Sequence, residues 1–220
     1  SLTQRFFNAL THLEFLPNSP TLMNAGKSKG QLAACFVLPL EDDLASIMDT
    51  LKLTALIHQS GGGTGFSFSK LRPQNSPVHS SHGVAAGPIG FLHLFNQLTE
   101  TIKQGGLRRG ANMGILSVSH PDIRAFMGCK EDVSQIKNFN LSISIPDAFI
   151  KAVQKKAPWP LVDPKTKKRV DEVNAQELFN QLATYAWKTG EPGLIFIDAV
   201  NRTHPTPAQG PIEATNPCGE

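Results

Sequence analysis

Short apolar segments alternate with amphipathic ones along this 220-residue chain, and this alternation limits its possible folds more than any other feature. The apolar segments predict strands, at residues 33–38, 66–69, 111–118, 139–145 and 194–198. The amphipathic segments predict helices, at residues 2–13, 44–59, 88–104, 122–129, 147–155 and 175–189. Strands that alternate with helices favour an α/β architecture with a mostly parallel sheet. No linker or internal repeat divides the chain, so we expect one domain over residues 1–220.

The stretches between these elements are predicted to be loops. Residues 75–87 are rich in Ser, Gly and His, and residues 156–172 are polar, with a basic run at Lys165–Arg169 that we expect to be solvated. Near the N-terminus two prolines favour extended backbone, so Ser19 and Thr21 are expected on a non-helical segment. Their hydroxyls could bind phosphate oxygens there, or they could bond to the local backbone.

Two of the predicted helices, 44–59 and 88–104, are apolar on more than one side. A helix of this kind must be buried twice, for example by its own sheet and by a partner subunit. The pattern therefore suggests contact with a second subunit.

Charge and cysteine content narrow the functional class. The net charge of +3 is mild and the basic residues are not clustered into long stretches, so an anionic small molecule fits better than a nucleic-acid polymer. No apolar run approaches the ~20 residues that cross a bilayer, and no signal-peptide pattern is present, so no membrane association is expected. Three scattered cysteines indicate a reducing, cytoplasmic setting, and no Cys/His spacing predicts a metal site.

Two glycine-rich stretches allow other groups to approach the backbone closely. Gly61–Gly65 contains four glycines but matches neither a Walker A loop nor a dinucleotide-binding fingerprint. The second stretch, Gln104–Gly110, combines glycines with Arg108 and Arg109, whose side chains can bind anions.

The pentapeptide Asn216–Glu220 places a thiol between a carboxamide and a carboxylate. In extended backbone Asn216, Cys218 and Glu220 would point the same way and could face one substrate together. Taken alone, the pentapeptide fits a frayed Pro/Gly tail better than a site.

Five separate stretches resemble one family when they are taken together and in order. They are Pro17–Asn24, Ala34–Pro39, Ser60–Gly65, Lys103–Gly114 and Asn216–Glu220. The chain resembles the large catalytic subunit of ribonucleotide reductase, most closely the adenosylcobalamin-dependent (class II) type. The resemblance implies a ten-stranded α/β barrel made of two antiparallel halves of five parallel strands. This chain would form the first half-barrel with its helices and would end in the finger loop that carries the radical cysteine.

The resemblance also implies reduction of ribonucleotides to 2′-deoxyribonucleotides by a thiyl-radical mechanism. Cys218 would carry the thiyl radical that abstracts the substrate 3′ hydrogen. Glu220 would be the base at the 3′ hydroxyl, and Asn216 would hold the ribose hydroxyls. Cys35 would protonate the departing 2′ hydroxyl and then supply an electron as half of a redox disulfide. The residue types suit this chemistry, because thiols exchange hydrogen atoms and form disulfides, and a carboxylate can act as a general base.

Further substrate contacts are implied by the same matches. Ser19 and Thr21 would hold the substrate phosphates, and Ala34 and Gly63 would approach the substrate through their backbones.

An allosteric site is implied within residues 42–112. The helices 44–59 and 88–104 would form a homodimer interface, where a deoxynucleoside triphosphate or ATP would bind as specificity effector. Asp42 and Arg72 match effector-contacting positions. Gln104 and Arg108 lie in the loop that would relay the identity of the effector to the substrate site.

The family needs more than these residues. A complementary C-terminal half of the barrel would carry the redox partner of Cys35 and the cobalamin site, and a thioredoxin-like reductant would restore the thiols. The chain is therefore read as a fragment or split part that is inactive alone. The alternatives are a regulatory nucleotide-binding module without catalysis, a class I large subunit with a separate radical-generating subunit, and a glycyl-type radical enzyme. Both di- and triphosphate substrates fit the sequence.

Overall fold

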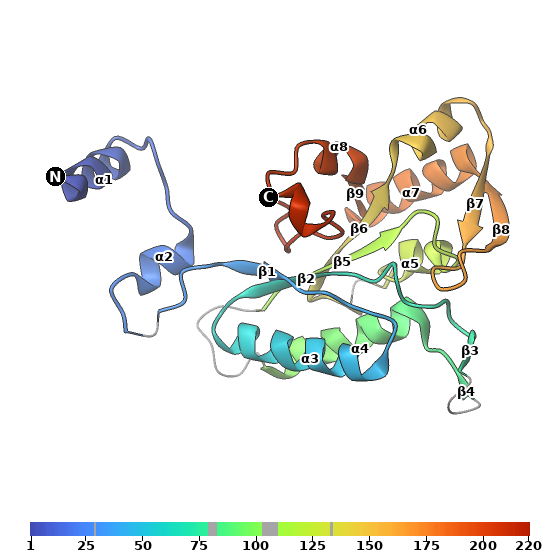
Figure 1. The fold of residues 1–220 in the computed structure, drawn as a ribbon, viewed down its shortest axis with the longest axis horizontal. Coiled ribbons are helices and arrows are strands. Elements are labelled where there is room, and N and C mark those ends of the chain that lie inside the picture. The colour runs from blue at the N-terminus through green and yellow to red at the C-terminus, as the bar shows by residue number, and fades with distance from the viewer. Residues whose placement is uncertain (29, 79–82, 103–109, 133) are drawn as a thin grey trace.

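The computed structural model describes residues 1–28, 30–78, 83–102, 110–132 and 134–220, and its centre is a five-stranded sheet (Figure 1). All neighbouring strands of this sheet run parallel. Their order across the sheet follows their order along the chain: β1 (Cys35–Val37), β2 (Gly63–Ser67), β5 (Asn112–Ser117), β6 (Phe139–Ile145) and β9 (Gly193–Phe196). The α/β architecture with parallel strands is confirmed, and it agrees with one half of an α/β barrel.

Helices connect these strands, and two of them begin at a residue whose side chain caps the helix. The helices are α3 (Leu44–Gln59), α4 (Gly87–Ile102), α5 (Ile123–Gly128), α6 (Asp147–Gln154) and α7 (Ala175–Thr189). At the start of α3, Asp43 Oδ2 accepts the backbone N–H of Ser46 at 2.9 Å. At the start of α7, Asn174 accepts two backbone N–H groups, and the helix ends at Gly190 in the left-handed region. In the described part of the chain, no helix is both long and apolar enough to span a membrane.

One face of the sheet, which we call the outer face, packs against helices through aromatic side chains. Phe66 of β2, Phe95 of α4 and Phe139 of β6 are almost completely buried there, together with Phe68. The ring centroids of Phe66 and Phe95 lie 4.7 Å apart. Large buried rings of this kind dominate the energetics of a core.

The opposite face, which we call the inner face, is crossed by the C-terminal segment, residues 197–220. This segment begins with α8 (Ile197–Arg202) and a short 3₁₀ helix at Pro207–Gln209. Figure 1 shows α3 and α4 on one side of the strands and the C-terminal segment, in red, on the other. Because side chains alternate along a strand, Gly63 and Gly65 of β2 point to the inner face while Phe66 points to the outer face.

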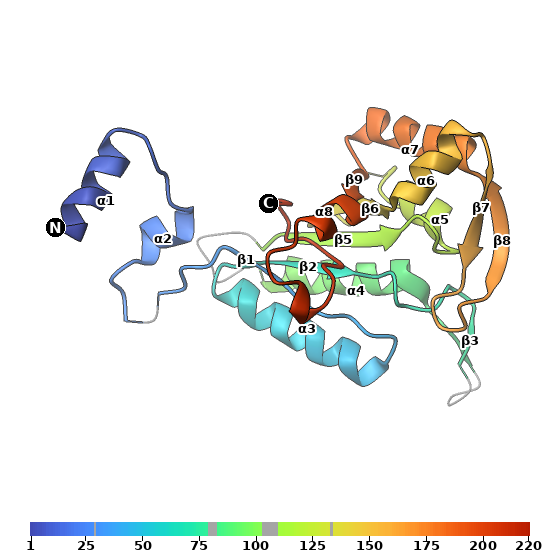
Figure 2. The ribbon, with the colours of Figure 1, turned by 45° about the horizontal axis from the view of Figure 1, so that its top comes forward.

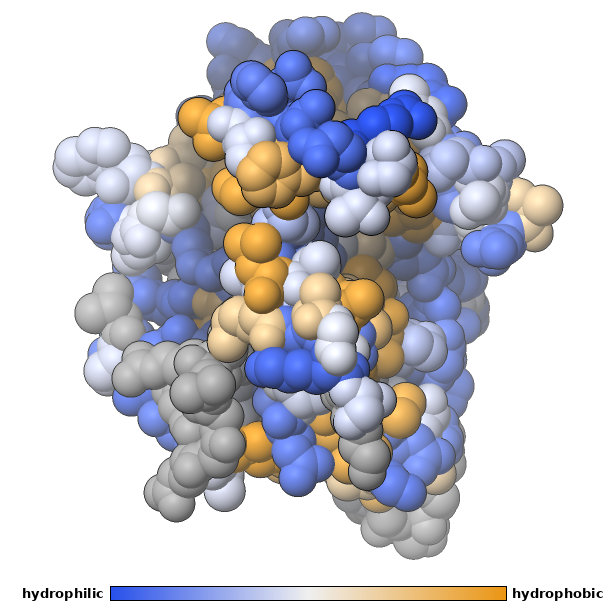
Figure 3. Space-filling view, turned by 90° about the vertical axis from the view of Figure 1, so that its left-hand side faces the viewer, coloured by the Kyte–Doolittle hydropathy of each residue, from blue (hydrophilic) through white to orange (hydrophobic). Residues whose placement is uncertain are grey.

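The N-terminal helices α1 (Leu2–Thr11) and α2 (Ser19–Asn24) extend away from the sheet in both ribbon views (Figures 1 and 2). Their apolar side chains are largely exposed, among them Phe6, Phe7 and Leu16. Figure 3 looks onto this end of the molecule and shows apolar residues scattered among polar ones.

The prediction of a non-helical segment at Ser19 and Thr21 is wrong, because α2 spans both residues. Asn18 caps this helix by accepting the backbone N–H of Thr21 at 3.0 Å. Pro20 lies in the first turn, where its missing N–H and fixed φ are compatible with a helix.

The predicted loop at residues 156–172 is also wrong, since it contains most of an antiparallel hairpin of β7 (Pro158–Val162) and β8 (Arg169–Asn174). The ring of Trp159 packs edge-on against Phe149 of α6, with centroids 5.1 Å apart, and Leu161 and Val173 are buried. This packing offsets the conformational entropy that is lost when a polar stretch becomes ordered.

Three smaller differences between prediction and structure follow. The strand predicted at 66–69 begins earlier, inside the glycine run at Gly63. The predicted loop 75–87 contains the two short strands β3 (Pro77–Val78) and β4 (Gly83–Val84). The predicted strand 194–198 ends at Phe196, and α8 starts directly after it.

Candidate active site

The C-terminal segment meets Cys35 above Gly63, at the point where β1 and β2 begin. Cys35 and Gly63 are partners in the parallel register of these strands. An ideal Cβ at Gly63 would lie 3.1 Å from Cys35 Sγ and 3.0 Å from Pro217 Cγ. Glycine therefore leaves room for the thiol of Cys35 and for the residue next to Cys218 on the same patch of the inner face.

Gly65 brings the segment even closer to the sheet. A Cβ at this position would lie only 1.8 Å from the carbonyl oxygen of Thr215 and 3.1 Å from Cα of Asn216. Both neighbours are backbone atoms, so no rotamer change could make room for a side chain. The glycine run thus makes room for the backbone of the C-terminal segment.

Three further contacts anchor the segment on the inner face. Asn140 Nδ2 donates to the carbonyl oxygen of Pro217 at 2.8 Å. Asn201 forms two hydrogen bonds with the backbone of Ile212, at 2.8 and 3.0 Å. Ala214 is buried against side chains of β5. Residues 212–217 are thereby held along their whole length.

The pentapeptide is a turn rather than an extended stretch, which corrects the expected alternation of its side chains. The N–H of Gly219 donates to the carbonyl oxygen of Asn216 at 3.1 Å. Asn, Pro and Gly occupy the positions that a type I turn favours. Pro217 is buried, whereas Cys218, Gly219 and Glu220 are exposed at the end of the turn.

A hollow of about 720 Å³ lies beside this turn. Asn216, Gly219 and Glu220 line it, together with residues of β1 such as Val37. An amide and a carboxylate therefore border one concave space, which suits a ligand with several hydroxyl groups.

The other predicted substrate contacts are placed differently. The carbonyl oxygen of Ala34 accepts the N–H of Gly63 at 2.9 Å, so these two backbone groups bond to each other. Ser19 and Thr21 lie on α2, which is apart from the C-terminal segment in both ribbon views, and the Thr21 hydroxyl donates to the Leu32 carbonyl oxygen (Figures 1 and 2). Their role as phosphate ligands stays a prediction.

The three cysteines differ in environment, and no disulfide joins them. Cys35 is half-buried and Cys218 is exposed, whereas burial raises the pKa of the Cys129 thiol to about 12. Cys129 therefore remains a thiol at neutral pH and is poorly suited to redox chemistry.

A buried polar network supports the first residues of β2 from the outer face. The Thr64 hydroxyl donates to Asn112 Oδ1 at 2.7 Å, and His58 Nε2 lies 3.1 Å from the same hydroxyl oxygen. Since that hydroxyl has one proton, His58 Nε2 carries its own and donates it. Burial, opposed by a hydrogen-bond contribution from Asn112, lowers the pKa of His58 to about 4, so the ring is neutral at pH 7.

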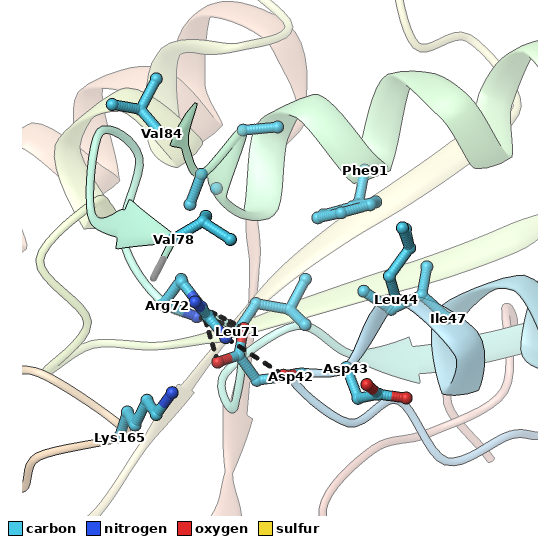
Figure 4. Close-up of a pocket in the computed structure, with 13 residues that line it drawn as sticks. Asp42, Asp43, Leu44, Ile47, Leu71, Arg72, Val78, Val84, Phe91 and Lys165 are labelled. Carbon is cyan, nitrogen blue, oxygen red and sulfur yellow. Dashed lines mark hydrogen bonds and ion pairs between the residues drawn. The ribbon is translucent and has the colours of Figure 1, made fainter. Parts of the chain in front are cut away.

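A second pocket, of about 620 Å³, contains the predicted effector residues Asp42 and Arg72 (Figure 4). Arg72 Nε lies 2.8 and 3.0 Å from the two carboxylate oxygens of Asp42, whose Oδ1 also accepts the backbone N–H of Arg72. The side chains of Leu44, Ile47 and Phe91 form an apolar wall. Gln104 and Arg108, also predicted to contact the effector, lie outside the described residues.

Sequence reasoning missed the anchors of the C-terminal segment and one lining residue of the second pocket. Asn140, Asn201 and Lys165 stand in segments with no recognisable motif. The basic run around Lys165 is the available signal, although a run of this kind also fits a solvated loop.

Comparisons with known proteins identify the family to which the chain is similar. The family profile for the ribonucleotide reductase barrel domain matches residues 33–220, and the profile for the all-alpha domain of ribonucleotide reductase matches residues 1–30. A vitamin B12-dependent ribonucleoside-diphosphate reductase from Thermoplasma acidophilum is 52% identical over 217 residues, or 98% of this chain and 28% of that protein.

Two more relatives show how far the similarity extends. A protein of the same name from Mycobacterium tuberculosis is 50% identical over 99% of this chain and 32% of its own length. The ribonucleoside-diphosphate reductase large subunit of Vaccinia virus is 32% identical over 97% of this chain and 31% of its own length. The chain thus spans about 30% of the length of these curated relatives. Since the barrel-domain profile covers most of the sequence, the chain belongs to the ribonucleotide reductase family.

Proposed function

We propose that this chain carries the radical thiol and one redox thiol of an enzyme that reduces ribonucleoside diphosphates to 2′-deoxyribonucleotides. The observation that supports this most strongly is the contact over Gly63, where Cys35 Sγ and Pro217 approach the same point. It puts Cys35 beside the turn that carries Cys218. The diphosphate is favoured because the relatives with about half of their residues identical are named ribonucleoside-diphosphate reductases.

In the proposed reaction a thiyl radical on Cys218 abstracts the 3′ hydrogen of the ribose and becomes a thiol. Glu220 accepts the proton of the 3′ hydroxyl, which eases departure of the 2′ hydroxyl as water after protonation. Asn216 holds the ribose hydroxyls. All three side chains belong to the turn at residues 216–219 and its next residue, so one short segment would orient the reacting carbon atoms.

Cys35 has the second role in this proposal. It donates the proton to the departing 2′ hydroxyl and then forms a disulfide with a thiol of the complementary half-barrel, which supplies the two electrons of the reduction. The 3′ hydrogen is then returned from Cys218, which regenerates the thiyl radical. A thioredoxin-like dithiol reduces the disulfide after each turnover.

We propose adenosylcobalamin as the radical source, in line with the B12 dependence named for the relatives. When bound, it would supply the organic radical that takes the hydrogen atom from the thiol of Cys218. The exposed position of Cys218 at the end of the turn fits an approach of this group from outside the described residues. No described residue is assigned to hold the corrin.

The pocket at Asp42 and Arg72 is proposed as the effector site, at a homodimer interface built by α3 and α4. These helices lie side by side in the ribbon (Figure 1), and Leu44, Leu53 and Leu56 of α3 are exposed to 64%, 47% and 53%. An apolar helix surface of this kind favours burial by a second subunit. The effector would be a deoxynucleoside triphosphate or ATP.

The radical assignment is tested in the enzyme complemented with the second half of the barrel. We expect Cys218→Ala to abolish reduction of ribonucleoside diphosphates and hydrogen exchange with adenosylcobalamin. The matched control is Cys129→Ala, which removes a half-buried thiol away from the turn and should keep both activities. Reduction by the Cys218→Ala enzyme would show that another residue carries the radical. Effector binding without turnover in the complemented wild type would instead indicate a regulatory module.

A further inference from the structure

The effector pocket has a wall that comes from a distant part of the chain. Lys165, in the loop between β7 and β8, lines the pocket together with Asp42 and Arg72. Figure 4 shows its ammonium group directed toward the Arg72–Asp42 pair. A basic run expected to be a solvated loop thus contributes one cation to a concave site.

The hairpin loop that carries Lys165 is well ordered by its own hydrogen bonds. Asp163 Oδ1 accepts the backbone N–H groups of Lys165 and Thr166 at 2.9 and 2.7 Å. Asp163 also closes the loop through its own N–H, which donates to the Lys168 carbonyl oxygen at 2.9 Å. Such an Asx-type turn fixes the direction in which the backbone presents the next side chain.

The base of the hairpin is fixed to the rest of the molecule. The N–H of Val162 donates to the Ser119 carbonyl oxygen at 2.8 Å, and Trp159 packs on Phe149. Lys165 therefore projects from a supported loop rather than from a free one.

The charges of the other lining residues explain why Lys165 matters. The guanidinium of Arg72 is already paired with the Asp42 carboxylate, and each of these side chains is only 20% exposed. Asp43 contributes a second negative charge, although its carboxylate caps α3. Among the described residues no ion pair involves Lys165, so its ammonium is the one uncommitted cation of the lining. Without Lys165 the charged side chains of Arg72, Asp42 and Asp43 would sum to a net charge of −1, which would repel a polyphosphate.

We propose that Lys165 binds the polyphosphate of the nucleotide effector, and that Arg72 is a positioning residue held by Asp42 beside it. This inference rests on the proposed effector function of the pocket and adds a residue from outside the region of residues 42–112 to which that site was assigned. The apolar wall of Leu44, Ile47 and Phe91 is left to pack against the base and sugar. The ligand class is therefore a nucleoside with a chain of phosphates.

Isothermal titration of dTTP and of thymidine into the full chain tests this proposal. We expect Lys165→Gln to weaken dTTP binding about fivefold, which corresponds to ~1 kcal/mol, and to leave thymidine binding unchanged. Lys165→Arg should bind dTTP like the wild type, because it keeps the charge. The loss should shrink at high salt, where an exposed charge is screened.

The matched control is Lys168→Gln, which removes the same charge from the same loop but does not line the pocket. Equal weakening by Lys165→Gln and Lys168→Gln, or equal dTTP affinity of Lys165→Gln and wild type, would overturn the proposal while leaving the effector site intact. If the wild type did not bind dTTP, the effector site itself would be refuted, and the role of Lys165 with it. Thermal unfolding of each variant shows whether the exposed substitution has left the fold unchanged.

Discussion

The two faces of the parallel sheet are made from different kinds of residue, although the same strands form both. The outer face carries Phe66, Phe139 and other large apolar groups that interlock with helices. The inner face carries Gly63 and Gly65 on the same strand as Phe66, and the backbone of Thr215 and Asn216 lies against it. Stability thus comes mainly from one face, and on the other the two glycines leave room for the C-terminal turn to approach the sheet.

The strongest test of this division substitutes, one at a time, two adjacent residues of β2 that point to opposite faces of the sheet. Gly65→Ala places a methyl group where the carbonyl oxygen of Thr215 now lies. We expect the C-terminal segment to be displaced and reduction by the complemented enzyme to fall about a hundredfold, because small errors in position are costly in catalysis. Denaturation curves should show little loss of stability, since the helix packing is untouched.

Its counterpart is Phe66→Ala, which removes a fully buried ring from the outer face. We expect the free energy of unfolding to fall by about 3–5 kcal/mol. The comparison fails if Gly65→Ala lowers stability as much as Phe66→Ala does, or if it leaves activity unchanged.

The buried histidine of the outer face gives a pH-dependent test. The pKa of His58 is about 4 in the folded protein, against an ordinary value of 6.5. Between these values the unfolded chain binds a proton that the folded chain does not, so stability falls as the pH is lowered from 6.5 to 4 and levels off below. The total loss is about 3 kcal/mol. Urea unfolding at pH 7.5, 5.5 and 4 should show a smaller loss of stability for His58→Gln than for the wild type. If stability fell equally with pH in both proteins, the low pKa of His58 would be contradicted.

Removal of one anchor of the inner face should act locally. Asn140→Ala deletes the hydrogen bond to the Pro217 carbonyl oxygen, which is worth about 1 kcal/mol. We expect amide exchange in residues 212–220 to become roughly fivefold faster, with no change in the helices. Asn180→Ala, on an exposed surface of α7, should leave exchange in both places as it was.

The smallest effect on stability is expected at the surface ion pairs of Lys70, one of which reaches the C-terminal segment at Glu213. Lys70 Nζ lies 2.8 Å from Glu41 and 2.9 Å from Glu213, and the pKa of Lys70 is raised mainly by its hydrogen bond to Glu41. All three side chains are about half exposed, so Lys70→Gln should cost less than ~1 kcal/mol. The difference should vanish in 1 M salt, and a larger or salt-independent loss would mean that Lys70 helps to hold the C-terminal segment.

The architecture was accessible from the sequence because hydrophobic period and capping signals are local. Apolar and polar residues alternate along the strand at residues 139–145, and Asp43 and Asn174 stand where helices begin. The turn at the pentapeptide could also have been recognised, since Asn216, Pro217 and Gly219 occupy favoured positions. By contrast, the helix at Ser19–Asn24 differs from the extended backbone that its prolines predict, because Pro20 occupies the first helical turn, where proline is tolerated.

The contacts that assemble the site could not be derived in this way. The closeness of Gly65 to Thr215 depends on backbone atoms far apart in the sequence, which leave no pattern in residue type. Asn140 and Lys165 act through partners that only the folded sheet and hairpin bring near. The β7–β8 hairpin itself was hidden by prolines and charges that reduce the strand signal.

The order of the strands across the sheet has a consequence for how the molecule is made. Each strand of the sheet pairs with the strand of the same sheet that comes before it along the chain. The sheet can therefore grow strand by strand as the chain leaves the ribosome. β9 completes it at Phe196, before residues 212–218 have been synthesised. The surface on which the turn rests is therefore formed before the turn that carries Cys218, and the turn meets a sheet whose glycines already leave room for it.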